Sequence, residues 1–339
     1  MFDTVKIAIP LMLSKLEIEN IEWNQTDSSR RQAVNDTIFK KLYDNDFKGL
    51  PFIRYTYRED DPSKCRLKVE VSIPALLYGS NVNELRADDI DTFFKMMRKY
   101  ISVKLKIKLS RIPPINTWTA EKVHVCKNFN VGQLKSRYLN AMSGCSIPKY
   151  QKRTYNAKGS DRVESVEWKA TKKKEKLYDK EAEVEQQHQY PDKSRHLKRA
   201  KGILRYEIEL SDTEIRKISP GRRAVEILKM DVAAEILQKG LDRNGLSSGV
   251  KYTSLQQVID AINKETIPLR TKSSLIAFAT ELLFSGEDEC LNKYAASTFR
   301  KRKMQLRGIL GTDVLLIGDS MLPPLRVVPQ KKKTATVKQ

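Results

Sequence analysis

A histidine and a cysteine in the run Val-His-Val-Cys lie where they could act on one ligand. Successive side chains of a β-strand point to opposite faces of a sheet, so His124 and Cys126 share a face while the two valines face the core. The segments RLKVEV and LRYEIEL place Glu70, and Glu207 with Glu209, on polar strand faces. If these strands are neighbours, an imidazole and two or three carboxylates converge.

Such a mixed set of nitrogen and oxygen ligands suits Mg²⁺ or Mn²⁺, which prefer oxygen and leave coordination positions open for a phosphate. We therefore predict a divalent metal cofactor held by His124, Glu70 and Glu207, where it would polarise a scissile phosphate. The alternative is structural. In that case His124 is a core histidine hydrogen-bonded to the backbone, and the acids pair with lysines across the sheet.

Tyr178 follows a lysine run in KKKEKLYDKEAEVE and precedes Lys180 by two residues. A tyrosine hydroxyl that attacks a DNA phosphate forms a phosphodiester that keeps the energy of the cut bond, so the strand can be rejoined without a nucleotide cofactor. In an extended segment Lys180 would lie on the same side as Tyr178, where it could stabilise the developing charge. Packing is the commoner role of a tyrosine, and the chain has 13 tyrosines.

The charge of the chain favours a polyanionic partner. Its 63 Lys and Arg against 42 Asp and Glu give a formal net charge of +21, and such a charge indicates partners rather than fold. Basic residues gather in 169–201, which could equally be a solvated loop without a partner, and in KYAASTFRKRKMQLRGIL. We predict DNA contacts for Lys172, Lys173, Lys174, Arg205, Arg300 and Arg302.

The four cysteines form no Cys-x-x-Cys pair, which argues against a zinc finger and against a disulfide framework. No run of about 18 apolar residues occurs, and charges interrupt the apolar N-terminus. We therefore expect a protein of a reducing cytoplasm that makes no membrane contact. The chain has no Gly-x-x-x-x-Gly-Lys-Ser/Thr loop, so any strand unwinding requires a separate motor.

Period-two alternation predicts strands within the first 210 residues. Strands are expected in these segments: Val5–Ile9, RLKVEV, KLKIKL at 104–109, Lys122–Cys126, Val163–Trp168 and Ile203–Leu210. Apolar residues at helical spacing from Ile90 to Ile101 predict a helix between two of them. Together they predict an α+β fold, with a central antiparallel sheet in a first domain over residues 1–210.

From Ser211 the pattern changes to that of helices. The segments SDTE and TSLQ have the spacing of a capping box, and apolar stripes follow them. We predict a mostly helical C-terminal domain over 211–328, with a DNA-binding or accessory role. The basic tail 329–339 is too polar to pack, so we expect it to be disordered.

Several short segments, in the same order, resemble the gene II/X family of phage and plasmid replication proteins. They are FDTVKIAIP, VEVSIPALLYGSN (69–81), VHVCKNFNVG (123–132), VEWKATKKKEKLYDK (166–180), EQQHQ (185–189) and LRYEIEL (204–210), and they span most of the chain. The resemblance implies a nicking and joining endonuclease domain with a central antiparallel, HUH-like sheet, followed by a helical domain. It also implies that Tyr178 is the nucleophile and that Lys180 is its neighbouring lysine.

The chain departs from the family at one position of the expected metal site. The family segment Arg-Ile-Asp supplies an acidic ligand and here reads Lys122-Val123-His124. A histidine before a hydrophobic residue is similar to the His-hydrophobic-His metal strand of the wider rolling-circle nuclease superfamily, with Cys126 in place of the second histidine. Glu70 and Glu207 match the family pattern. The replacement is compatible with an altered metal preference or with a weakened site.

The resemblance implies a rolling-circle replication initiator, which nicks and rejoins one strand at a phage or plasmid origin through a 5′-phosphotyrosyl intermediate in a bacterial cytoplasm. Its partners would be single-stranded or hairpin origin DNA and the host helicase and replication machinery. Whether the chain also pairs with a second copy in a homodimer stays open. Two alternatives stay open. One is a non-catalytic DNA-binding repressor or copy-control protein on the same fold, and the other is a relaxase for conjugative or transposon transfer.

Overall fold

The computed structural model describes residues 1–29, 37–43, 49–58, 61, 64–187, 192–312, 314–317 and 321–327. The predicted tail 329–339 lies outside the described residues, as do His188 and Gln189 of the segment EQQHQ. Within the described ranges, no helix is both long and apolar enough to cross a bilayer.

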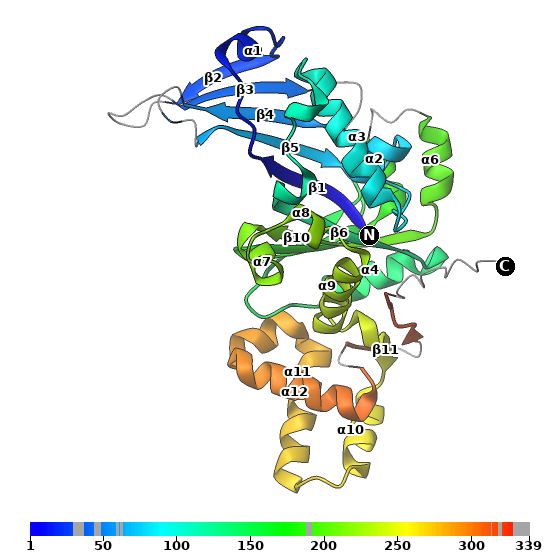
Figure 1. The fold of residues 1–339 in the computed structure, drawn as a ribbon. Coiled ribbons are helices and arrows are strands. Elements are labelled where there is room, and N and C mark those ends of the chain that lie inside the picture. Colours follow the sequence, from blue (N-terminus) through cyan, green and yellow to red (C-terminus); the bar gives the residue numbers. More distant parts are fainter. Residues whose placement is uncertain are drawn as a thin grey trace, which may run out of the picture.

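A ten-stranded antiparallel sheet forms the upper part of the molecule (Figure 1). Its strand order is β2-β3-β4-β5-β1-β6-β10-β9-β8-β7, so the first strand of the chain lies near the middle. The strands are β1 (Phe2–Ile9), β2 (Gln25–Ser29), β3 (Thr37–Tyr43), β4 (Phe52–Tyr57), β5 (Arg66–Ser72), β6 (Thr119–Asn130), β7 (Gln151–Asn156), β8 (Val163–Lys169), β9 (Lys173–Asp179) and β10 (Ile203–Ser211). The prediction of an α+β chain with a large antiparallel sheet is confirmed.

Helices pack on one face of this sheet, where the apolar positions of the strands are buried. They include α3 (Asp89–Lys104), α4 (Lys135–Ser143), α7 (Asp212–Ile218), α8 (Ala224–Ile227) and α9 (Met230–Arg243). Val69, Val123 and Tyr206 are buried on this face, which forms one continuous core. The alternate positions carry charged side chains on the opposite face. Among the shorter helices, α2 (Ile73–Tyr78) and α6 (Lys193–Ala200) lie to the right of the sheet in Figure 1, whereas α1 (Lys15–Glu19) lies above β2 and β3. Helix α5 (Lys180–Gln186) contacts α6.

The strand predicted at 104–109 is wrong. Residues up to Lys104 continue α3, and 3-10 turns follow at Leu109–Arg111 and Ile115–Thr117. Lys106 has a φ of +52°, which ends any extended conformation, while Leu105 and Ile107 are buried from the turn. A short alternation of lysine and apolar residues therefore also fits a helix end that leads into a buried turn. In the described part of the basic stretch 169–201, residues 173–186 and 193–200 form β9, α5 and α6.

Three helices form a second core below the sheet (Figure 1). They are α10 (Leu255–Lys264), α11 (Leu269–Lys293) and α12 (Ala296–Leu310). The core of the sheet nevertheless continues past residue 210, because α7, α8 and α9 belong to it, and the segment 322–327 returns to it. The predicted boundary at residue 210 therefore does not coincide with the boundary between the two cores.

Two further features join the cores. The first is a small sheet whose strand β11 (Val250–Thr253) precedes the three helices in the sequence and whose strands β12 (Leu315–Ile317) and β13 (Met321–Leu322) follow them. The buried carboxylate of Glu287 in α11 accepts hydrogen bonds from Ser146 N, next to α4, and from Lys303 Nζ in α12, both at 2.7 Å. Lys303 therefore has a structural role within the basic helix α12.

Gly240 marks a close approach of α9 to β10. A Cβ atom at this position would overlap Tyr206 Oη and lie 2.6 Å from Ile208 Cδ1. We predict that Gly240→Ala lowers the free energy of unfolding by about 1–3 kcal/mol, because overpacking shifts side chains or the helix. Chemical denaturation measures this change.

Gly308→Ala in α12 is the matched control, since a Cβ there meets no atom within 4 Å. The better helix propensity of alanine should raise the free energy of unfolding by about 0.5–1 kcal/mol. Effects of the same sign in the two variants would contradict the close packing of α9 on β10.

Candidate active site

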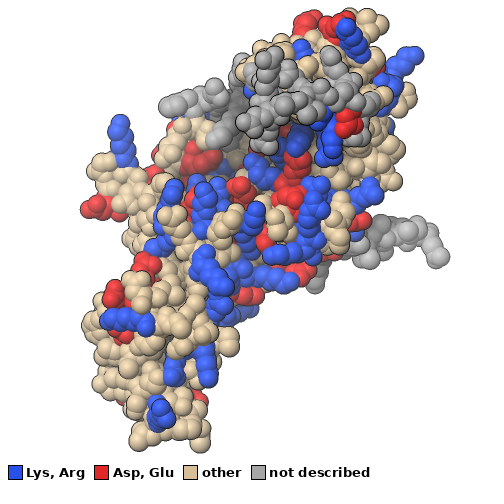
Figure 2. Space-filling model, turned by 90° about the vertical axis from the view of Figure 1, so that its left-hand side faces the viewer, with Lys and Arg blue, Asp and Glu red and all other residues tan. Residues whose placement is uncertain are grey.

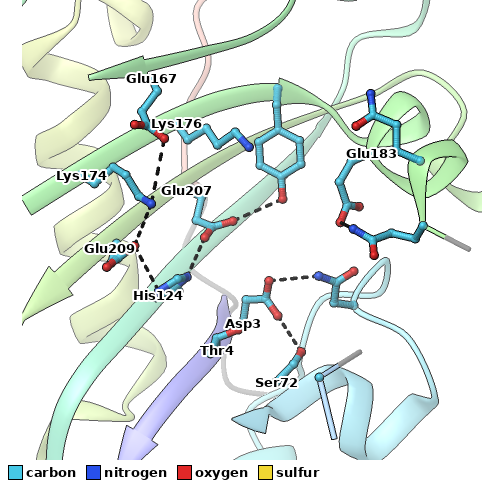
Figure 3. Close-up of a pocket in the computed structure, with 15 residues that line it drawn as sticks. Asp3, Thr4, Ser72, His124, Glu167, Lys174, Lys176, Glu183, Glu207 and Glu209 are labelled. Atoms are coloured by element: carbon cyan, nitrogen blue, oxygen red, sulfur yellow. Dashed lines mark hydrogen bonds and ion pairs between the residues drawn. The ribbon is translucent and has the colours of Figure 1, made fainter. Parts of the chain in front are cut away.

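A cavity of about 360 Å³ lies on the charged face of the sheet. Strands β6, β8, β9 and β10 supply seven of its 15 lining residues. The others come from the start of β1, the end of β5, helix α5 and nearby loop residues (Figure 3). Five carboxylates but only two lysines are among its lining residues. The cavity is therefore locally acidic in a chain that is strongly basic.

The register of the strands brings together residues that are distant in the sequence. Glu209 of β10 lies opposite His124 of β6 and opposite Lys174 of β9. Two residues along, Glu207 lies opposite Lys176. Because β10 runs between β6 and β9, side chains from all three strands share one face.

A chain of polar contacts crosses these strands (Figure 3). Tyr178 Oη donates a hydrogen bond to Glu207 Oε2 at 3.2 Å, and Glu207 Oε1 lies 2.8 Å from His124 Nδ1. On its other side, His124 Nε2 lies 3.4 Å from Glu209 Oε2, which pairs with Lys174 Nζ at 3.0 Å. The structure thus brings together Tyr178, His124, Glu207 and Lys174 from the predicted set, and adds Glu209.

The charges of the cavity follow from these contacts. Burial, and then the charge of Glu207, raises the pKa of Tyr178 well above its ordinary value. Burial would raise the pKa of Glu207, but the hydrogen bond and charge of His124, with the charges of Arg205 and Lys180, lower it to about 2. Burial also opposes a charge on His124, yet Glu207 and Glu209 outweigh it and raise its pKa. At neutral pH Tyr178 is therefore protonated and Glu207 is ionised.

Lys176 was not selected from the sequence, yet it faces the tyrosine directly. Its Nζ lies 4.8 Å from the centroid of the Tyr178 ring. Within the described part of the chain, Lys176 makes no other hydrogen bond or ion pair, so its ammonium group is available to an anion in the cavity. The signal in the sequence was its position two residues before Tyr178 on the same strand face.

Lys180 lies close to Tyr178 but is committed to other partners. Its Nζ is 5.9 Å from the ring centroid, and it donates hydrogen bonds to Asn81 Oδ1 at 2.7 Å and to Glu183 Oε2 at 2.6 Å. The extended segment assumed for it ends at Asp179, and Lys180 is the first residue of α5. Burial, and then the charge of Arg205, lowers the pKa of Lys180 to about 8.

Glu70, predicted as a metal ligand, lies on the same sheet face but beyond the cavity. Its Oε1 accepts a hydrogen bond from Lys122 Nζ at 2.6 Å. This is the cross-strand pairing that the sequence left open as the alternative for the acids. Glu209, from the same strand as Glu207, lies beside His124 instead. Cys126 shares the face but is buried.

Arg205, predicted to contact DNA, is only 1% exposed. Its Nε donates a hydrogen bond to Asn128 Oδ1 at 2.7 Å, and its Nη1 lies 3.8 Å from Asp3 Oδ2. The guanidinium group therefore joins β10, β6 and β1 beneath the cavity and does not reach the surface. Alternation correctly put Arg205 on the polar face of its strand, but neighbouring segments cover it.

The other predicted DNA contacts lie on β9, in the turn before it and on α12. Lys172 is exposed in the turn before β9, and Lys173 points to the opposite face of the sheet, 3.7 Å from Glu175. On α12, Arg300 is exposed and Arg302 lies 3.3 Å from Gln305 Oε1. Figure 2 shows Lys and Arg side chains in a band across the middle of the molecule, with acidic side chains between them.

The cavity offers one pair of possible metal ligands. His124 Nε2 is buried without a hydrogen-bond partner, and Glu209 Oε2 lies 3.4 Å from it. Neighbouring ligands of an octahedral Mg²⁺ ion lie about 3.0 Å apart, so this pair matches two ligand positions with a small shift. No group of three or more His, Cys, Asp or Glu side chains among the described residues is arranged to hold a metal. The remaining positions of an ion would be left to water and phosphate.

Comparisons with models of protein families, with curated proteins and with solved structures found no match to this chain.

Lys180 provides a test of the electrostatics of the cavity. Its pKa of about 8 in the folded protein lies below the ~10.4 of a free lysine. Between these values the unfolded chain binds more protons, so the free energy of unfolding rises with pH. We predict that the native protein gains about 2 kcal/mol over the variant Lys180→Met between about pH 7 and about pH 9.5.

Urea denaturation at a series of pH values measures this difference. Lys198→Met, at an exposed position of α6, controls for the loss of one positive charge. A difference between native protein and Lys180→Met that stays constant over this range would contradict the assigned environment of Lys180.

Proposed function

We propose that this protein cuts and rejoins one strand of DNA through a covalent bond to Tyr178. The observation that carries the proposal is the Tyr178 hydroxyl, which lines a polar cavity and donates to Glu207, while the unpaired ammonium group of Lys176 lies over the tyrosine ring. A tyrosine that only packs in a core has no need of an acid at its hydroxyl and a lysine over its ring. The segment resemblance to gene II/X replication proteins supports the same residue.

The reaction is a transfer of one phosphodiester bond. Tyr178 Oη attacks the phosphorus atom, a P–Oη bond forms, and the bond to the 3′ oxygen breaks. The hydrogen bond to Glu207 Oε2 orients the phenol, and the proton that the phenol loses is balanced by the proton that the 3′ oxygen gains, so the strand ends in a free 3′ hydroxyl. Because one phosphodiester replaces another, the reverse reaction rejoins the strand.

The local charge explains why a cation is needed. Five carboxylates line the cavity against two lysines, so a phosphate entering alone would be repelled. His124 Nε2 and Glu209 would hold a divalent Mg²⁺ or Mn²⁺ ion, which supplies a Lewis acid and offsets this negative charge. Lys176 and Lys174 bind the phosphate oxygens, and the positive charge around Tyr178 favours ionisation of a phenol whose pKa is otherwise raised.

The biological role follows from the resemblance. The protein would start rolling-circle replication at a phage or plasmid origin in a bacterial cytoplasm, acting on single-stranded or hairpin DNA with a host helicase. A relaxase for DNA transfer uses the same chemistry on a different origin. The basic band in Figure 2 suits the approach of DNA, with an affinity that falls as salt rises.

Covalent capture tests the nucleophile. The protein is incubated with Mn²⁺ and a pool of random single-stranded oligonucleotides labelled at the 3′ end, and a denaturing gel reveals labelled protein. We expect an adduct with the native protein and none with Tyr178→Phe, because phenylalanine has no nucleophilic oxygen. Tyr294→Phe, in the three-helix unit, is the control.

An adduct that persists in Tyr178→Phe would assign the nucleophile elsewhere. Binding of the pool without any adduct would favour the non-catalytic repressor on the same fold.

A metal titration separates the ligand pair indicated by the structure from the set predicted by the sequence. His124→Ala removes the nitrogen ligand, and we expect adduct formation to need at least about tenfold more Mn²⁺. Glu70→Gln should leave the Mn²⁺ requirement unchanged, because Glu70 pairs with Lys122. The opposite pattern, with Glu70→Gln impaired and His124→Ala normal, would refute the pair of His124 and Glu209.

A further inference from the structure

A second cavity, of about 460 Å³, adjoins the first on the side of β7 and β8. Both cavities are lined by Tyr178, Lys176 and Glu167, so the tyrosine stands between them. The mechanism described above uses only the first cavity. A strand whose phosphate lies at Tyr178 must continue on both sides of it, and the second cavity is one direction in which it can continue.

The register of β7, β8 and β9 places one side chain from each strand in a row across this region. Tyr155 of β7 lies opposite Ser165 of β8, and Ser165 lies opposite Tyr178 of β9. Two strand spacings separate the backbones of the two tyrosines by about 10 Å. This separation matches the reach of a single nucleotide from its phosphate to the far edge of its base.

Ser165 has a hydroxyl group that the protein itself leaves unsatisfied. The residue is 7% exposed, lines the second cavity, and its Oγ is buried without a hydrogen-bond partner among the described residues. A buried hydroxyl without a partner costs free energy. A bound group that hydrogen-bonds to Oγ would remove this cost.

Tyr155 offers a ring surface beside that hydroxyl. It is 46% exposed and lines the cavity, and within the described part of the chain its ring has no stacking partner. Exposed aromatic rings on a sheet are platforms on which nucleobases stack. The ring and the serine hydroxyl therefore offer one stacking surface and one hydrogen-bonding group.

The charge of the second cavity selects which part of a nucleotide it can take. Its acids are Glu164, Glu167, Asp179 and Glu183, against the single lysine Lys176. A phosphate would be repelled from this lining, whereas an uncharged base would not. The chemistry therefore fits the neutral part of a nucleotide whose phosphate lies in the first cavity.

We infer that the second cavity holds the base of the nucleotide next to the scissile phosphate, stacked on Tyr155 with its polar edge at Ser165 Oγ. This inference rests on the proposed function and adds a substrate subsite to it. It implies that the base at one position beside the cut contributes to binding, and that this contribution is made through Tyr155 and Ser165.

An abasic scan tests the subsite in the Tyr178→Phe background, where the strand binds but no adduct forms. An oligonucleotide selected from the random pool is made abasic at each position in turn, and its dissociation constant is measured by fluorescence anisotropy. We expect one position at which loss of the base weakens binding about fivefold or more. With Tyr155→Ala added, loss of that base should have less than about a twofold effect, since the stacking surface is gone.

Two further variants separate recognition from structure. Tyr155→Phe keeps the ring and should retain the full effect of the abasic position. Ser165→Ala should weaken binding of the intact strand about two- to tenfold without lowering the free energy of unfolding, because its hydroxyl has no partner in the free protein. Thr154→Ala, on the opposite face of β7, should change neither quantity.

The possible failures are distinct. An abasic profile that is the same with and without Tyr155→Ala overturns the subsite, while the adduct test at Tyr178 decides the proposed function by itself. If no oligonucleotide binds at all, the subsite and the proposed function are both overturned.

Discussion

The partly buried charge of Glu207 is the interaction on which the cavity depends. A carboxylate withdrawn from water is costly unless its oxygens are paired. Here one oxygen faces His124 and the other accepts from Tyr178. Both partners sit on strands that pair with β10, so the arrangement exists in only one register of β6, β10 and β9. If β10 slipped by one residue against β6 and β9, the side chain of Glu207 would point toward the hydrophobic core.

The net charge of the molecule and the local charge of the cavity have opposite signs. The whole chain carries a formal charge of +21, and its field attracts a polyanion over a distance. The cavity itself is lined mainly by carboxylates, which resist a phosphate at short range. Attraction at long range and repulsion at short range thereby come from different groups. The basic surface attracts a polyanion, whereas the carboxylates of the cavity repel a phosphate unless a cation balances them.

Patterns within one segment predicted much of the sheet. The alternation around His124 and through 204–210 identified β6 and β10 and the faces of their residues. The same kind of pattern failed at 104–109, where a helix end and a buried turn also alternate. Of the two predicted capping boxes, the one at TSLQ is shifted by one residue, since Ser254 and Gln257 form it. The one at SDTE is wrong, because the Ser211 side chain does not cap α7 and donates to Lys172 O instead.

The composition of the site was harder to predict, because it depends on contacts between segments. The sequence could not distinguish Glu70 from Glu209 as the neighbour of His124, since strand order and register decide which acid meets a lysine. It also favoured Lys180 over Lys176, because the end of β9 beyond Tyr178 was not visible in the pattern. Arg205 is buried because it hydrogen-bonds to Asn128 and to the backbone of Asn81, which are distant in the sequence. A pattern within one segment cannot predict such contacts.

The chain's route through β11 and β12 makes the three-helix unit an insertion. These two strands pair in parallel, so the polypeptide departs from the sheet domain and comes back to it at neighbouring points. The length and surface of such an inserted unit can diverge between relatives while the sheet stays intact. Because β11 and β12 pair with each other, they also restrict the motion of the three helices relative to the sheet domain. The paired strands thereby limit how far α10, α11 and α12 can move relative to β9 and Tyr178.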